Sequence, residues 1–181
     1  MGYYSEKAAD QGFDLGDLLP TKASEGAPPD NRYLFHIEEA VIGVSESDKN
    51  TGVPYIRARA VVEEPTEFQG YSIFPTLWLT PNADEKQEKA NARTRGALRV
   101  ILGDEGYNKA ISQGADFDST VEAFVDALDN DKPQFVARVG VESEKKAKET
   151  GYPARNRINY YYPAAEWGEA VGKNGVADLP F

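Results

Sequence analysis

The sequence contains no cysteine, one histidine (His36) and one methionine among its 181 residues. Without cysteine it can form neither disulfides nor thiolate metal sites. One histidine cannot supply a zinc motif that needs two, and without cysteine the catalytic Cys–His dyads are excluded. A lone histidine within a strand is usually structural. We therefore expect no enzymatic activity, no cofactor and no metal centre.

Long apolar segments are missing as well. No run of apolar residues approaches the roughly 20 that a membrane-spanning helix needs. The first ten residues are polar and lack the apolar stretch of a signal peptide. These two absences predict a soluble, cytoplasmic protein.

The chain also lacks an excess of positive charge, since its formal net charge is −10. Taken alone, this argues against nucleic-acid binding, because phosphates require cations. The distribution is uneven, however. Residues 104–131 carry 8 acidic and 1 basic side chains, whereas residues 132–161 carry 7 basic and 3 acidic ones. A basic strip on an acidic body is compatible with a nucleic-acid surface, and ordinary solvated charge is the alternative.

Hydrophobic periodicity predicts a mainly β fold with a helical insertion (α+β). Strands are expected over residues 33–44, 55–62, 71–79, 134–142 and 155–162. Helical spacing follows the third strand, with expected N-caps at Asn82 and Ser119 and a helix end at Gly103. Three strands, helices and two strands are the element order of a five-stranded OB-fold barrel. Leu77 and Leu79 alternate with Trp78, and the sequence leaves open which face of that strand is core.

The predicted elements divide the chain into three parts. Residues 1–31 are rich in Gly, Pro and Asp and form an N-terminal arm. Residues 32–162 form the OB-fold domain. Residues 163–181 form a flexible, acidic C-terminal tail.

Aromatic and basic side chains recur together on two strands and one loop. Residues two apart in a strand point the same way, so Tyr55, Arg57 and Arg59 are expected to share a face. The same rule groups the alternate residues from Arg155 to Tyr161. Flat rings and cations together suit the bases and phosphates of a single strand. The candidate nucleic-acid-binding residues are Tyr55, Arg57, Arg59, Lys145, Lys146, Lys148, Tyr152, Arg155, Arg157, Asn159 and Tyr161.

The sequence ends Asp178-Leu179-Pro180-Phe181. This resembles the C-terminal tip of bacterial single-stranded DNA-binding proteins, which dock that tip onto replication and repair proteins. A terminal Phe offers a ring and a carboxylate together to a basic-rimmed pocket. The family has several acidic residues before the tip, whereas residues 175–177 here are Gly-Val-Ala. The resemblance implies that residues 178–181 bind protein partners.

Short sequence segments of the central domain resemble phage-encoded single-stranded DNA-binding proteins of the small OB-fold kind. These segments are residues 71–79, 97–103, 136–139 and 156–158. The resemblance implies binding and protection of single-stranded DNA, without strong sequence preference, in replication, recombination and repair. For a bacteriophage protein the compartment would be the host cytoplasm. A homo-oligomer is one of the states left open. Two rival functions are a phage structural β-barrel and an acidic DNA mimic that inhibits a DNA-binding enzyme.

Overall fold

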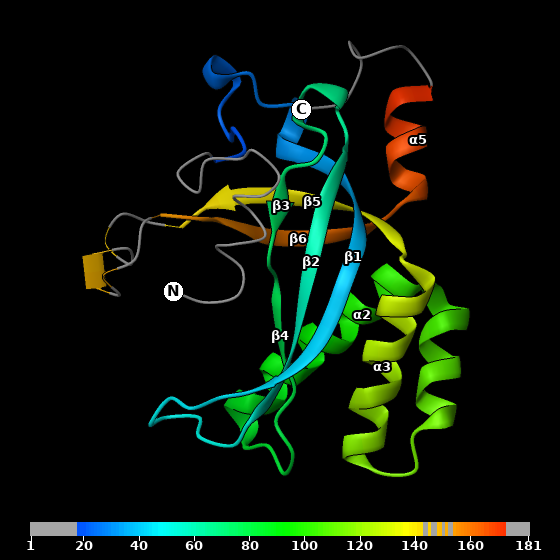
Figure 1. The fold of residues 1–181 in the computed structure, drawn as a ribbon. Coiled ribbons are helices and arrows are strands. Elements are labelled where there is room, and N and C mark those ends of the chain that lie inside the picture. Colours follow the sequence, from blue (N-terminus) through cyan, green and yellow to red (C-terminus); the bar gives the residue numbers. More distant parts are fainter. Residues whose placement is uncertain (1–17, 143–144, 146–147, 150, 152–153, 173–181) are drawn as a thin grey trace.

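The computed structural model describes residues 18–142, 145, 148–149, 151 and 154–172. Within them, six strands form one antiparallel sheet of order β3-β2-β1-β5-β6, with β4 also paired to β2 (Figure 1). The strands are β1 (Arg32–Val44), β2 (Pro54–Glu64), β3 (Ser72–Ile73), β4 (Thr76–Trp78), β5 (Gln134–Val141) and β6 (Asn156–Pro163). The helices are α2 (Glu85–Gln113), α3 (Phe117–Asp131) and α5 (Ala165–Gly172), and short 3-10 turns are η1 (Ala23–Glu25), η2 (Pro29–Asn31) and η3 (Thr66–Phe68).

The mixed α+β class predicted from the sequence is confirmed, with α2 and α3 inserted between β4 and β5. The expected third strand is divided at Pro75 into β3 and β4, which pair with different parts of β2. Proline interrupts a strand because it has no N–H for the ladder. Within the described residues the sheet is open between β3 and β6. No helix there is both long and apolar enough to cross a bilayer.

The core lies where β1, β2 and β5 meet the helices. Phe35 and Phe135 face each other across the paired strands, with ring centroids 5.5 Å apart. The alternation predicted for β2 is confirmed on the inner side, where every second side chain is at most 1% exposed: Ile56, Ala58, Ala60 and Val62. Each large apolar side chain so buried contributes about 1.5–3 kcal/mol to folding.

The helix boundaries differ from the predicted ones. Asp84, not Asn82, caps α2 by accepting from the Gln87 N–H at 2.8 Å. Asp116 caps α3, where Ser119 is the third helical residue that completes the capping box. Gly103 does interrupt the helix, with φ 71°, but α2 resumes after it. It resumes because the following turns are also amphipathic: Tyr107 is buried and lies 5.2 Å from the Phe124 ring of α3.

The segment before β1 packs against the sheet and forms hydrogen bonds with it at residues 18–20. Leu19 is 1% exposed and belongs to the core. Its N–H donates to Asn156 Oδ1 at 2.8 Å, and Asn156 Nδ2 donates to its carbonyl at 3.2 Å. The Tyr33 hydroxyl donates to the Pro20 carbonyl at 2.6 Å. The predicted arm therefore crosses the starts of β1 and β6, and its residues 1–17 lie outside the described residues.

Helix α5 follows β6 directly, in a segment predicted to be a flexible tail. Its first turn has the Trp167 N–H bonded to the Ala164 carbonyl at 3.0 Å. Glu166 on this helix lies 3.5 Å from an Nη1 of Arg32 at the start of β1. Sequence periodicity could not reveal α5 reliably, because eight residues span barely two helical turns.

Candidate nucleic-acid interface

Two aromatic rings lie side by side on the outer face of the sheet, away from the core. Tyr55 of β2 pairs with Trp78 of β4, and their ring centroids are 5.0 Å apart. Tyr55 also pairs with Gly43 of β1, where a Cβ would lie 2.3 Å from the Tyr55 Cζ. The Tyr55 ring therefore lies across the bare backbone of Gly43. Both rings are half-buried, so each keeps surface accessible to a ligand.

This pair settles the face of the third predicted strand. Leu77 and Leu79 are 6% and 5% exposed and belong to the core, which places Trp78 on the outer face. Sequence alternation separated the leucines from Trp78, but the choice of core face needed the register with β2. Trp78 was therefore absent from the predicted site, although it lies beside Tyr55, which was in it.

Arg57 and Arg59 follow Tyr55 on β2 but have different surroundings. Arg57 is half-buried, in register with Val41 and Thr76 next to the aromatic pair. Arg59 is only 6% exposed. It contacts Glu38 at 2.6 Å and donates to the Ser72 hydroxyl at 3.1 Å.

Arg59 was predicted to contact phosphates, and the structure instead places its guanidinium within the sheet, beside Glu38. A bulge between Ile37 and Glu39 of β1 inserts Glu38 into the pairing opposite β2. The Glu38 carboxylate pairs with Arg59, and the paired arginine forms part of the sheet's own structure. A buried guanidinium needs such a partner.

The candidates on β6 do not share one face. The pairing with β5 shifts between Arg138 and Val139, so Asn159 is an extra residue in β6. Before the bulge Ile158 faces the core, and after it Tyr161 does, opposite Ala137. A one-residue insertion reverses the alternation of every residue beyond it.

The prediction that Tyr161 is an outer, base-stacking ring is wrong for this reason. Its ring packs 5.7 Å from that of Phe135, and burial raises the pKa of its hydroxyl far above the usual value. Tyr160 and Tyr162 occupy the outer face instead, and Tyr160 is 58% exposed. Arg157 is exposed on that face too, and the exposed Asn159 side chain lies against Gly140.

The β5–β6 connection carries the remaining candidates. The Lys145 ammonium is exposed and lies 3.9 Å from the Glu149 carboxylate one helical turn away. Lys148 is exposed too. Arg155 precedes β6 and is largely exposed, with its Nε 3.3 Å from the buried Glu142 carboxylate. Lys146 and Tyr152 lie outside the described residues, as does the predicted partner-binding tip, Asp178, Leu179, Pro180 and Phe181.

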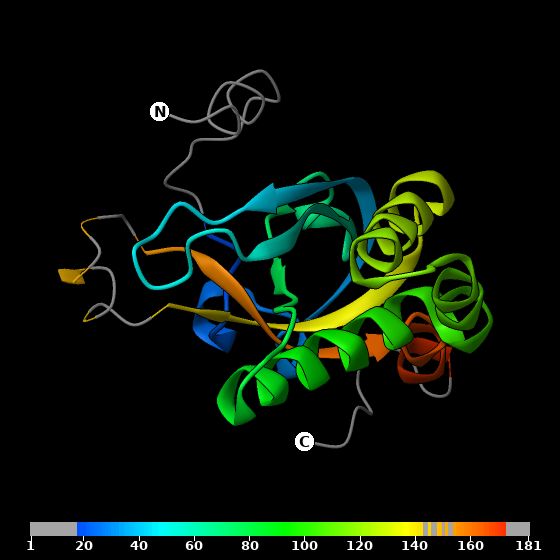
Figure 2. The same ribbon diagram turned by 90° about the horizontal axis from the view of Figure 1, so that it is seen from below.

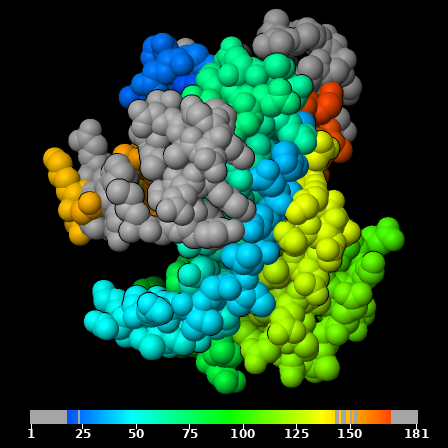
Figure 3. Space-filling view, in the orientation of Figure 1, coloured from blue at the N-terminus to red at the C-terminus, as the bar shows by residue number. Residues whose placement is uncertain are grey.

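Acidic and basic regions occupy different parts of the molecule. The acidic segment 104–131 forms the second half of α2, the following turn and α3. The β1–β2 loop and the described part of the β5–β6 connection extend on the opposite flank in both ribbon views (Figures 1 and 2). The space-filling view separates α3 from the β1–β2 loop in the same way (Figure 3). The acidic segment 104–131 therefore lies away from these loops.

Within the described ranges, no group of three or more His, Asp and Glu side chains is arranged to hold a metal ion. The described candidate site consists of aromatic rings and cations on the sheet. Comparison with models of known protein families gave no match for this chain. A search of the curated proteins gave none either.

Proposed function

We propose that this chain binds single-stranded DNA without strong sequence preference, protecting it during replication, recombination and repair. The observation that supports this proposal most strongly is the pair of Tyr55 and Trp78 on the outer face, with Arg57 beside it. Bases stack on aromatic rings whatever their identity, because every base has a π-face. A neighbouring guanidinium suits the phosphate that follows each base.

The arrangement of the strands supports an OB-type barrel as the finer description of the fold. In that fold the loops between strands 1 and 2 and between strands 4 and 5 border the binding surface. The corresponding segments here are the β1–β2 loop and the described part of the β5–β6 connection, which project from one side of the molecule (Figure 2). The acidic segment 104–131 lies on the other flank, where salt screens its repulsion of a strand bound at the candidate residues.

An electrophoretic shift of labelled oligo-dT at low and high salt tests the proposal. We expect a shifted complex at low salt that weakens as salt rises, because phosphate contacts release counterions. A phage structural barrel or an acidic DNA mimic predicts no shift at either salt concentration. The mimic would instead leave the oligonucleotide unbound and bind a DNA-binding protein.

Arg57 and Arg59 provide a matched pair of variants on one strand. We expect Arg57→Ala to weaken oligo-dT binding and to make the log–log salt slope about 0.7 less negative, the loss of one phosphate contact. Arg59→Ala should instead lower the free energy of unfolding by about 1–3 kcal/mol, because it leaves the Glu38 and Ser72 contacts unmade. Urea titration and fluorescence anisotropy separate the two effects. Equal salt slopes for Arg57→Ala and the wild type would contradict the assignment.

We propose that the C-terminal tip, residues 178–181, recruits replication and recombination proteins. Deleting Phe181 should abolish their capture from a bacterial lysate, because ring and correctly placed carboxylate are lost together. Deleting Val176 is the control, since it shortens the tail equally and preserves the tip. DNA binding should be unchanged in both variants. Identical sets of captured proteins from wild type and the Phe181 deletion would refute the recruiting role.

A further inference from the structure

A second aromatic and basic cluster lies on the outer face of β1, β5 and β6. Arg32 and Arg138 are directly paired across β1 and β5, and Arg138 is paired with Tyr160 of β6. The Arg138 guanidinium lies 5.6 Å from the centre of the Tyr160 ring, and that of Arg32 lies 4.1 Å from the Tyr162 ring. Rings beneath the guanidinium groups hold them by cation–π attraction. This cluster was not among the sequence candidates.

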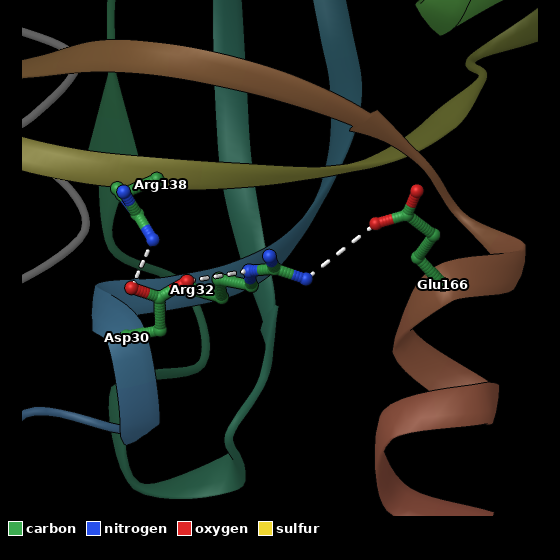
Figure 4. A network of polar contacts seen from close by, with 4 residues as sticks. All are labelled: Asp30, Arg32, Arg138 and Glu166. Carbon is green, nitrogen blue, oxygen red and sulfur yellow. Dashed lines mark hydrogen bonds and ion pairs between the residues drawn. The ribbon is translucent and has the colours of Figure 1, made fainter. Parts of the chain in front are cut away.

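The Asp30 carboxylate occupies the space between the two arginines (Figure 4). One of its oxygens accepts from Arg32 Nε at 3.1 Å, and the other accepts from Arg138. Burial would raise the pKa of Asp30, but hydrogen bonds and charges of Arg138 and Arg32 outweigh it and lower that pKa. The Asp30 carboxylate is therefore ionised at neutral pH, and it is an anion that the chain itself supplies to the two arginines.

The Arg32 and Arg138 guanidinium groups, called the clamp below, have the geometry of an anion site. Two guanidinium groups converge on two oxygens of one anionic group, and a phosphodiester also presents two unesterified oxygens. Arg32 and Arg138 remain partly exposed, with 26% and 34% of their side chains accessible. Glu166 of α5 lies 3.5 Å from Arg32 Nη1, so this arginine also contacts a second carboxylate of the same chain.

The adjacent ring gives the site its ligand class. Tyr160 is 58% exposed, so much of its ring is accessible beside the Arg138 guanidinium. A phosphate clamp next to an accessible ring matches the phosphate–base repeat of a single strand. A duplex would not offer its bases to that ring, because they are stacked and paired within the helix.

We propose that Arg32 and Arg138 form a phosphate subsite for single-stranded DNA, which the Asp30 carboxylate occupies until a phosphodiester displaces it, and that the adjoining base stacks on Tyr160. The subsite rests on the proposed function and extends it to β5 and β6. Asp30 then acts as an internal competitor, which lowers the apparent affinity by the fraction of time that it fills the clamp.

Asp30→Asn tests the competition. Asp30 has φ 56°, a conformation that asparagine also tolerates. We expect the variant to bind oligo-dT about three- to tenfold more tightly in fluorescence anisotropy at low salt, because the clamp is vacated. The matched control is Asp104→Asn, which makes the same charge change and removes the 3.4 Å contact between Asp104 and Arg99, outside the sheet.

Two further variants keep the test decisive if Asp30→Asn alters the fold. Arg138→Gln should weaken binding and make the salt slope about 0.7 less negative. Combined with Asp30→Asn, it should cancel the gain in affinity. Tyr160→Leu should weaken binding to oligo-dT but not to an abasic strand of equal length, because only the former has bases to stack.

The outcomes separate the subsite from the function on which it rests. The subsite alone would be overturned by three results together. Wild-type protein binds oligo-dT, Asp30→Asn has the same affinity for it as Asp104→Asn, and Arg138→Gln has the affinity and salt slope of the wild type. Wild-type protein that fails to bind oligo-dT would overturn both. The subsite would be supported if Asp30→Asn binds oligo-dT more tightly than the Asp104→Asn control and this gain is lost when Arg138→Gln is added.

Discussion

Replacing Trp78 with alanine should weaken oligo-dT binding about 5- to 150-fold, which corresponds to the 1–3 kcal/mol that one stacked base contributes. Trp78 is the larger ring of the outer-face pair and lies 5.0 Å from Tyr55. Its removal should also reduce the support for the Tyr55 ring, which lies across Gly43. Fluorescence anisotropy with labelled oligo-dT measures the change in dissociation constant.

Two substitutions at the same position serve as controls for this result. Trp78→Phe keeps a flat π-face and should retain most of the affinity. Trp78→Leu keeps apolar contact without a π-face and should behave like Trp78→Ala. Full affinity in Trp78→Ala, at an unchanged melting temperature, would exclude Trp78 from the binding surface.

The second large effect concerns stability. Leu19→Ala should lower the free energy of unfolding by about 2–5 kcal/mol, the usual cost of emptying a buried leucine site. Leu19 is 1% exposed, whereas its neighbour Leu18 is 36% exposed. Leu18→Ala is therefore a matched control, expected to change stability by less than about 0.5 kcal/mol. Equal urea midpoints for the two variants would show that residues 18–20 do not pack against the core.

The coarse fold could be predicted because its signals are local. Alternation at Ile56, Ala58, Ala60 and Val62 marked the inner face of β2, and all four are buried. The third strand, expected to run unbroken over residues 71–79, is instead divided at Pro75 into β3 and β4. Helical spacing located the insertion, although the caps at Asp84 and Asp116 lie a few residues from the expected positions.

The outer-face site was harder to predict, because it depends on pairing between distant strands. The bulge at Asn159 turns Tyr161 toward the core and Tyr160 and Tyr162 to the outer face, and nothing local in the sequence indicates it. The bulge at Glu38 similarly places that carboxylate beside the buried Arg59 guanidinium. Bulges arise from strand register, which single-sequence periodicity does not contain.

Arg32 and Arg138 illustrate the same limit. They are more than one hundred residues apart in sequence, and only the pairing of β1 with β5 makes them neighbours. Asp30 joins them because η2 turns immediately before β1 with two successive residues at positive φ, Asp30 and Asn31. Charge counts along the chain could identify a basic region but not a clamp.

Competition between oligo-dT and duplex DNA tests the central claim most directly. Labelled oligo-dT is bound to the full chain at low salt, and unlabelled oligo-dT or duplex is added at equal nucleotide concentration. We predict that unlabelled oligo-dT displaces the probe at much lower concentration than duplex does, because stacking on Tyr55 and Trp78 requires unpaired bases. A duplex that competes as well as oligo-dT, or a probe that never binds, would contradict single-stranded DNA binding.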